Sequence, residues 1–181
     1  NVGMLDDWEL RTGGILVLRM TALRTLTLDQ LLPVLRVPNA HFINLQYSDT
    51  AAERAALGAH HDLRIVHWQD AIDDYDDTAA LVTALDLVIS VCTAVVHLGG
   101  ALGRPVWVLA PYSPEWRYGF AGETMPWYPS VKVFRQPEFR EWSPVIRDVS
   151  QRLHDLCAAR ASAPTSGDGS GRATRTSSSG H

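Results

Sequence analysis

The fold is decided by residues 86–106, which read DLVISVCTAVVHLGGALGRPV. The segment Asp86–Val91 is a nearly continuous apolar run, which is typical of a strand buried on both faces of a parallel sheet. A helix is expected to begin at about Ala94, with Thr93 as its N-cap. Because the strand enters the helix with almost no loop, the helix N-terminus is expected at the carboxyl edge of the sheet, where doubly wound folds bind ligands.

Strand and helix patterns alternate on both sides of this segment. Gly103 is expected to end the central helix in the C′ position, and Pro105 introduces the next strand. The expected strands are Val2–Leu5, His41–Tyr47, Asp62–Trp68, Val106–Ala110 and Val131–Phe134. The other expected helices are Asp29–Arg36, Thr50–Leu57, Thr78–Leu85 and Trp142–Arg160, the last with an apolar stripe at Val145, Val149, Leu153 and Leu156. The alternation predicts an α/β fold, a Rossmann-like parallel sheet with helices on both faces.

The chain has 181 residues, of which 46% are hydrophobic and 20% charged. Residues 1–160 suit one α/β domain with a substantial buried core. Residues 161–181 are poor in apolar side chains and rich in Gly, Ser, Thr and Ala, so we expect a disordered tail there. Since the chain carries a net charge of −4 and this tail carries +1, the folded part carries −5. An acidic domain argues against a nucleic-acid partner, because affinity for phosphate backbones comes from clustered Lys and Arg.

The two cysteines, Cys92 and Cys157, offer neither a disulfide framework nor a metal-ligand spacing. A reducing compartment, the cytoplasm, is therefore expected, with no bound metal and no cofactor. No apolar run approaches the roughly 18 residues of a membrane span, and the acidic N-terminus is unlike a signal peptide. Because it starts inside an expected strand, the chain is interpreted as a piece of a longer protein.

Residues 70–77 contain five aspartates. We interpret them as a solvated loop followed by an acidic helix start that complements the helix dipole. A metal site is the less favoured alternative.

The junction at residues 90–97 is the strongest candidate for a binding site. Free N–H groups and a partial positive charge at a helix N-terminus favour an anionic group such as a diphosphate. His97 follows Thr93 by four residues, so both side chains lie on one face of the helix and can reach a common ligand. Gly99 and Gly100 each cost about 1 kcal/mol in a helix relative to alanine, which predicts close packing against the sheet or against the ligand.

Several segments together resemble one known family. They are residues 76–109 around the central junction, FINLQY at 42–47, Trp116-Arg117, WYPS at 127–130 and FRQ at 134–136. The chain resembles, from roughly Arg24 to Leu156, the C-terminal domain of the heptosyltransferase family (glycosyltransferase family 9). It looks most similar to the branch fused to tetratricopeptide repeats in bacteria, which is related to protein O-GlcNAc transferases.

This resemblance implies a GT-B glycosyltransferase, in which two Rossmann-like domains enclose a cleft and the C-terminal one binds a nucleotide-sugar donor without a metal. Carried over by position, the contacts to the donor diphosphate are Thr93, Ala94 and His97. The contacts to the nucleotide or sugar are Gln46, Tyr47, Trp116 and Arg117. The candidate general base of the family belongs to the N-terminal, acceptor-binding domain, which this chain is expected to lack, so we name no catalytic base and the catalytic residues stay unknown.

Alternatives remain open at several of these positions. Many relatives have Asp where this chain has Cys92, so a degenerate binding or scaffolding domain of a repeat protein is the rival to an active glycosyltransferase domain. An epimerase of nucleotide sugars is a third, less favoured reading. Cys92 itself is either a small packing residue, which we favour, or a thiol made reactive by the helix N-terminus. Arg24 is a candidate phosphate contact, whereas Trp127 and Trp142 are expected to be structural.

Overall fold

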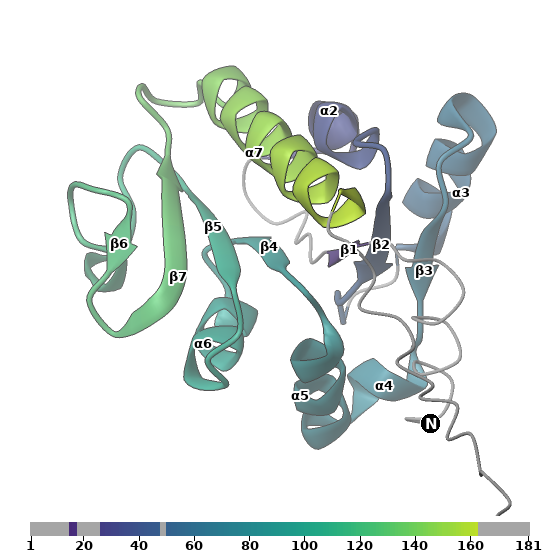
Figure 1. The fold of residues 1–181 in the computed structure, drawn as a ribbon, viewed down its shortest axis with the longest axis horizontal. Coiled ribbons are helices and arrows are strands. Elements are labelled where there is room, and N and C mark those ends of the chain that lie inside the picture. The colour runs from purple at the N-terminus through teal and green to yellow at the C-terminus, as the bar shows by residue number, and fades with distance from the viewer. Residues whose placement is uncertain (1–14, 18–25, 48–49, 163–181) are drawn as a thin grey trace, which may run out of the picture.

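A computed structural model describes residues 15–17, 26–47 and 50–162 (Figure 1). The predicted strand Val2–Leu5, the candidate Arg24 and nearly all of the predicted tail, residues 163–181, lie outside the described residues. The strands are β1 (Ile15–Val17), β2 (Ala40–Asn44), β3 (Ile65–His67), β4 (Val88–Val91), β5 (Val106–Ala110), β6 (Thr124–Met125) and β7 (Tyr128–Arg135). The helices are α2 (Leu32–Leu35), α3 (Ala51–His61), α4 (Asp70–Asp73), α5 (Tyr75–Ala84), α6 (Ala94–Ala101) and α7 (Ser143–Ala161), with 3₁₀ helices η1 (Asp29–Leu31) and η2 (Trp116–Tyr118).

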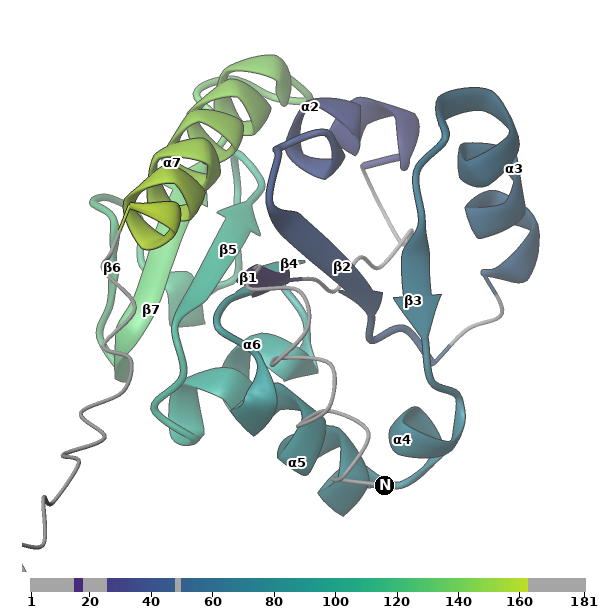
Figure 2. The ribbon, with the colours of Figure 1, turned by 45° about the vertical axis from the view of Figure 1, so that its right-hand side comes forward.

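The strands form two groups that are almost entirely parallel. The first has the order β1-β2-β3, and the second has the order β4-β5-β7-β6. Among the strands of the described residues, only β6 runs antiparallel to its neighbour. In both views β1 lies beside β4 (Figures 1 and 2), which gives the strand order of a doubly wound fold with its switch point between these two strands.

One hydrophobic core lies on each face of this layer. Phe42, Ile89, Leu109 and Phe134 belong to one core, together with residues of α2, α3 and α7. Their neighbours along the same strands belong to the other core with residues of α5 and α6, namely Ile43, Val88, Val108 and Val133. Each core thus draws residues from both groups of strands, because successive side chains of a strand point to opposite faces. The prediction of an α/β, Rossmann-like sheet covered on both faces is confirmed.

Some element boundaries differ from the predicted ones. The strand expected at His41–Tyr47 ends at Asn44, and the one at Asp62–Trp68 is reduced to Ile65–His67 because α3 continues to His61. The prediction of a loop at the start of the acidic segment, residues 70–77, is also wrong, because Asp70–Asp73 forms the helix α4. The Asp74 carboxylate caps α5 by accepting hydrogen bonds from the N–H groups of Asp76 and Asp77 at 2.8 and 3.2 Å, which starts that helix at Tyr75 instead of Thr78.

Residues 111–162 contain more regular secondary structure than the sequence indicates. The long loop expected over Pro111–Ser130 contains η2, β6 and the first residues of β7. On α7 the buried stripe continues in steps of four to Cys157, whereas Leu156 is 37% exposed, which corrects its predicted place in the core. Gly103 follows α6 with a φ of 67°, as expected of a left-handed C′ glycine. Among the described residues, we find no helix with the length and apolar content needed to cross a membrane.

Candidate functional site

An open pocket of about 430 Å³ lies where β4 passes into α6. One wall is the turn after β4 with the first turn of α6, and the other is η2 with the residue before it. The lining residues are Cys92, Thr93, Ala94, His97, Glu115, Arg117 and Tyr118. Four predicted ligand contacts, Thr93, Ala94, His97 and Arg117, therefore line one pocket at the N-terminus of α6.

Thr93 occupies the N-cap position of α6, as predicted, with extended backbone angles of φ −139° and ψ 172°. Its side chain makes no capping hydrogen bond, and its Oγ1 lies 2.9 Å from Ser90 Oγ instead. The Ser90 hydroxyl donates its single proton to the Val91 carbonyl at 2.8 Å, so Thr93 is the donor of the pair. The N–H groups of the first turn are thus left without a cap from Thr93, which suits an anionic ligand.

His97 is half-buried in the pocket wall between two tyrosine rings. The ring centroids of Tyr118 and Tyr128 lie 5.9 and 5.8 Å from that of His97. Burial lowers the pKa of the imidazole below its ordinary value of 6.5, and the positive charge of Arg117 lowers the pKa further. At neutral pH the imidazole is therefore uncharged and offers a ligand one N–H donor.

Cys92 lies beneath the turn and packs against the core that contains α5 and α6. Burial raises the pKa of its thiol to about 11, although a hydrogen bond with Tyr118 and the charge of Arg135 act in the opposite direction. The thiol is therefore protonated at neutral pH. This contradicts the alternative of a reactive thiolate, because loss of hydration outweighs the favourable field of the helix N-terminus.

Arg117 carries the positive charge of the pocket. Its guanidinium forms an ion pair with the carboxylate of Glu115, and its Cζ lies 5.7 Å from the ring centroid of Trp116. Trp116 itself is 64% exposed and adjoins the pocket without lining it. Glu115 and Tyr118 were not predicted from the sequence, since neither belongs to a motif.

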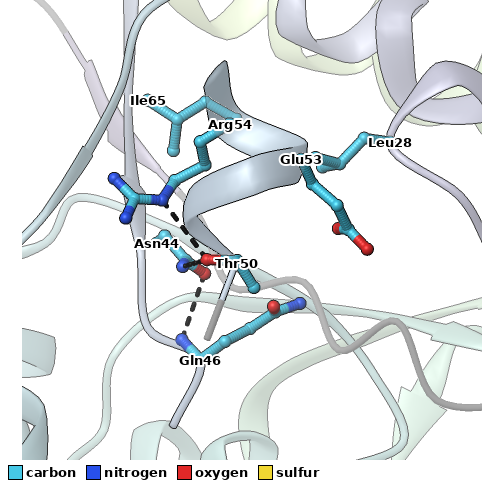
Figure 3. A pocket seen from close by; sticks show the side chains of 7 residues that line it. All are labelled: Leu28, Asn44, Gln46, Thr50, Glu53, Arg54 and Ile65. Carbon is cyan, nitrogen blue, oxygen red and sulfur yellow. Dashed lines mark hydrogen bonds between the residues drawn. The ribbon is translucent and has the colours of Figure 1, made fainter. Parts of the chain in front are cut away.

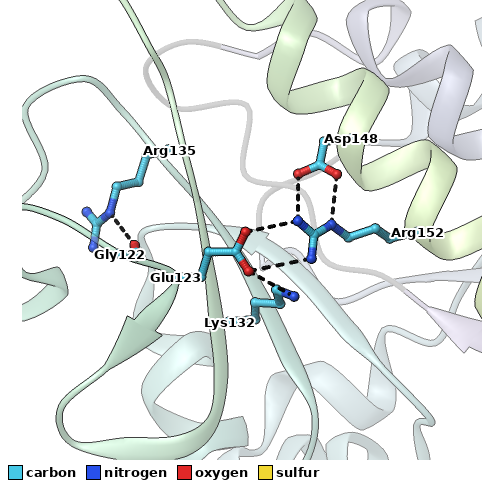
Figure 4. Close-up of polar contacts among 6 residues, drawn as sticks. All are labelled: Gly122, Glu123, Lys132, Arg135, Asp148 and Arg152. Carbon is cyan, nitrogen blue, oxygen red and sulfur yellow. Dashed lines mark hydrogen bonds and ion pairs between the residues drawn. The ribbon is translucent and has the colours of Figure 1, made fainter.

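Arg135, at the end of β7, holds the segment that follows η2. Its guanidinium donates to the carbonyl oxygens of Tyr118 at 2.5 Å, Gly119 at 3.1 Å, Ala121 at 3.4 Å and Gly122 at 2.8 Å. Figure 4 shows the contact with Gly122. This one side chain fixes the backbone that carries Tyr118, a pocket residue. Arg135 lies in the FRQ segment at 134–136, but its local sequence predicts no role for it.

A separate ion-pair network lies on the other side of Gly122. Figure 4 shows the Glu123 carboxylate between Lys132 and Arg152, and Arg152 also contacts Asp148 on α7. All four side chains are substantially exposed, so each pair contributes at most about 1 kcal/mol to stability. We therefore assign this network to the attachment of α7 to β7 and not to the pocket.

Gln46 and Tyr47 do not line the pocket. Gln46 is only 3% exposed and faces a separate hollow of about 10 Å³ beside the start of α3. Its backbone N–H donates to Asn44 Oδ1 at 3.1 Å, and Asn44 Nδ2 donates to Thr50 Oγ1 at 2.7 Å. Figure 3 shows the Gln46 side chain beneath Thr50 and the first turn of α3, where it lines this hollow. Tyr47 is 48% exposed.

The two helical glycines serve close packing within the chain. A Cβ on Gly99 would lie 2.7 Å from Val106 Cγ2, and a Cβ on Gly100 would lie 2.5 Å from Tyr128 Cγ. These distances are far below an ordinary carbon–carbon contact of about 3.5–4.0 Å. Of the two predicted reasons for the glycines, packing of α6 on β5 and on Tyr128 accounts for both.

The described residues contain no group of three or more His, Cys, Asp or Glu side chains that could hold a metal ion. The aspartates of residues 70–77 are instead used at helix starts, as described above. The candidate phosphate contact Arg24 cannot be placed relative to the pocket, because it lies outside the described residues.

Comparison with known proteins gives one curated relative and several structural ones. No family model matches the chain. It is 40% identical over 131 residues to the protein FlbA of Caulobacter vibrioides, an alignment that covers 70% of this chain and 21% of FlbA. The chain thus spans about a fifth of the length of this relative.

Among solved structures, one similar protein comes from a study of EarP-mediated arginine glycosylation of the translation elongation factor EF-P. It has a TM-score of 0.44 and 12% identity, and the match covers 91% of this chain and 63% of that one. Another is the wall teichoic acid polymerase TagF, with a TM-score of 0.43 and 13% identity over 88% of this chain and 40% of that one.

Proposed function

We propose that this chain is the donor-binding domain of a nucleotide-sugar-dependent glycosyltransferase of the GT-B type, similar to heptosyltransferases, with the acceptor domain outside this chain. The observation that carries the proposal is the convergence of Thr93, Ala94, His97 and Arg117 on one open pocket at the N-terminus of α6. This is the carboxyl edge of β4, at the switch point where doubly wound folds bind ligands. The segments that resemble the heptosyltransferase family supply the pocket's main wall.

The chemistry of the pocket suits a diphosphate leaving group. Backbone N–H groups of α6 and the guanidinium of Arg117 supply positive potential. The neutral imidazole of His97 donates one N–H hydrogen bond without first having to bind a proton. When the sugar–phosphate bond breaks, negative charge grows on the diphosphate. Donors that are already in position lower the energy of that transition state. Neither a metal nor a cofactor has a part in this proposal.

Glu115 is expected to weaken the binding of an anion to Arg117, because its carboxylate is already paired with this side chain. A diphosphate in the pocket would compete with the Glu115 carboxylate for Arg117. Both side chains are about half exposed, and an exposed ion pair is worth about 0.2–1 kcal/mol. The substitution Glu115→Gln is therefore expected to tighten binding of a nucleoside diphosphate by up to about five-fold.

The remaining predicted contacts lie outside the pocket. Trp116 borders it beside Arg117. Gln46 and Tyr47 follow β2, which pairs with β1 on the far side of the switch point, so a nucleotide would have to extend along the carboxyl edge of the sheet to meet them. Of these two, Tyr47 has the exposed side chain, and we propose that it is the one that reaches the nucleotide.

Calorimetric titration with UDP, ADP, CDP, GDP and dTDP tests the proposal. For the nucleotide that binds, His97→Ala is expected to weaken affinity about ten-fold, the value of one charge-assisted hydrogen bond. Thr93→Ala is expected to have a smaller effect, because its hydroxyl must first leave Ser90. His154→Ala, on the exposed side of α7, is the matched control. Unchanged affinity in both the Thr93 and the His97 variants would remove the proposed site.

A second candidate function, a degenerate domain that binds without catalysing transfer, is favoured by Cys92. A protonated thiol with a pKa of about 11 cannot replace a carboxylate as a hydrogen-bond acceptor. The two candidates are separated by Cys92→Asp in the full-length protein, with hydrolysis of the nucleotide sugar as the measured reaction. Activity that appears only in the variant indicates a degenerate domain, whereas activity already present with Cys92 indicates an enzyme.

A further inference from the structure

Two neighbouring tryptophans beside the pocket are exposed. Trp116 begins η2 and is 64% exposed, and Trp127, in the turn between β6 and β7, is 56% exposed. Their ring centroids lie 6.0 Å apart and their planes meet at 86°. Both Trp127 and Trp142 are expected from the sequence to be structural, but Trp127 is exposed, whereas Trp142 is buried as expected.

Contacts with neighbouring side chains hold the two tryptophan rings in place. Perpendicular aromatic contacts of this kind contribute about 0.5–1.5 kcal/mol beyond their buried area, and the Arg117 guanidinium lies 5.7 Å from the Trp116 ring. The next residue after Trp127, Tyr128, packs against Gly100 and His97. The two indoles therefore form a corner that is oriented before any ligand arrives, and we call Trp116 and Trp127 the aromatic corner.

Leaving this corner in water is unfavourable for the isolated chain. Burying one large apolar side chain stabilises a protein by about 1.5–3 kcal/mol, and adjacent exposed aromatics mark binding surfaces more often than single ones do. The corner is also continuous with the pocket, because Arg117 both lines the pocket and lies over Trp116. A phosphate bound to Arg117 would carry its next chemical group toward the corner.

We propose that the aromatic corner binds a pyranose ring, the sugar of a donor whose diphosphate occupies the pocket. This inference rests on the proposed function. Two ring planes at 86° form a floor and a wall, which fit a puckered ring that lays its apolar C–H face on one indole and its rim against the other. A flat nucleobase would instead favour a single face or two parallel ones. Because the corner is open to water, the hydroxyl groups on the part of the sugar rim that faces away from the indoles stay hydrated.

The test compares a nucleoside diphosphate with its own sugar conjugate. UDP is titrated against UDP-glucose and UDP-N-acetylglucosamine, and ADP against ADP-glucose and ADP-heptose, by calorimetry on the wild type, Trp116→Ala and Trp127→Ala. Phe139→Ala removes another exposed aromatic, 73% exposed in the segment before α7, and is the matched control. We expect Trp127→Ala to lower the affinity for the sugar conjugate roughly five- to thirty-fold, while the affinity for the bare nucleoside diphosphate changes less than about two-fold.

Two outcomes overturn the proposal. An equal loss for the conjugate and the bare diphosphate shows that the corner holds the nucleotide or acts only on the fold, and no loss for either shows that it touches no ligand. Titration with methyl glucoside and methyl N-acetylglucosaminide, followed by tryptophan fluorescence, separates this inference from the proposed function. If no nucleoside diphosphate binds, the proposed function fails, yet a fluorescence change that is lost in Trp127→Ala still supports a sugar site. The absence of both signals overturns both proposals.

Discussion

The substitution Gly99→Ala tests directly how tightly α6 lies on the sheet. The added Cβ would lie 2.7 Å from Val106 Cγ2, with Val82 Cγ1 and Val88 Cγ2 at 3.8 and 4.0 Å. Val106, the first residue of β5, is fully buried, so its side chain has little space into which to move. The helix or the strand must therefore shift by several tenths of an ångström.

The size of the effect follows from two opposing contributions. Alanine stabilises a helix by about 1 kcal/mol relative to glycine, while forcing an extra methyl group into a packed core costs typically about 1–3 kcal/mol. Because the contacted side chain is fully buried, we take the upper part of that range. The free energy of unfolding should fall by about 1–2 kcal/mol, which lowers the melting temperature by roughly 2–8 °C for a chain of this size.

Urea unfolding followed by tryptophan fluorescence measures this change, and Gly58→Ala is its matched control. Gly58 lies on the exposed side of α3, and a Cβ there would meet only the Leu63 carbonyl at 3.7 Å, an ordinary contact. The control should therefore gain about 0.5–1 kcal/mol from helix propensity alone. If Gly99→Ala is stabilised as much as Gly58→Ala, the close approach of α6 to β5 is refuted.

Three further predictions concern the pocket. Arg135→Lys should lower the free energy of unfolding by about 1–2 kcal/mol in urea unfolding, because an ammonium cannot reach four carbonyls as the guanidinium fork does; an unchanged midpoint would contradict this. Iodoacetamide labelling of Cys92, followed by mass spectrometry, should accelerate up to a pH of about 11, and a plateau near pH 8 would contradict a raised thiol pKa. The pKa of His97, measured by NMR, should lie below 6.5. Since the unfolded chain then binds this proton more readily, the wild type should lose stability as pH falls below 6.5 in a way that His97→Gln does not.

The centre of the fold could be predicted because its signals are local. The strand Val106–Ala110 was predicted with its observed ends, since Pro105 and the apolar run determine it together. The same holds for Thr93 as N-cap and for Gly103 after α6, because each depends on the conformation of one residue.

Other features depend on contacts that local patterns do not contain. Arg135 reaches back 13 to 17 residues to the carbonyls that it holds, and nothing in its immediate sequence indicates this. The strand β2 ends before Gln46 because Asn44 turns its side chain onto the following backbone. A shift of a few residues changes which way a side chain faces, so the sequence could not show that Gln46 turns toward α3 and away from the pocket.

The short antiparallel strand β6 has a consequence for behaviour at high concentration. An unpaired edge of a parallel sheet presents N–H and C=O groups to which another chain can add a strand, and this is a common route to aggregation. Here the long strand β7 is covered by only two residues of β6, with an irregular register between Thr124 and Met125. The strand at the opposite edge, β3, has three residues. Among the described residues, the two edge strands, β6 and β3, are both short, so neither offers a long template for an added strand. This arrangement discourages intermolecular sheet growth, while the strands nearest the pocket stay in the interior.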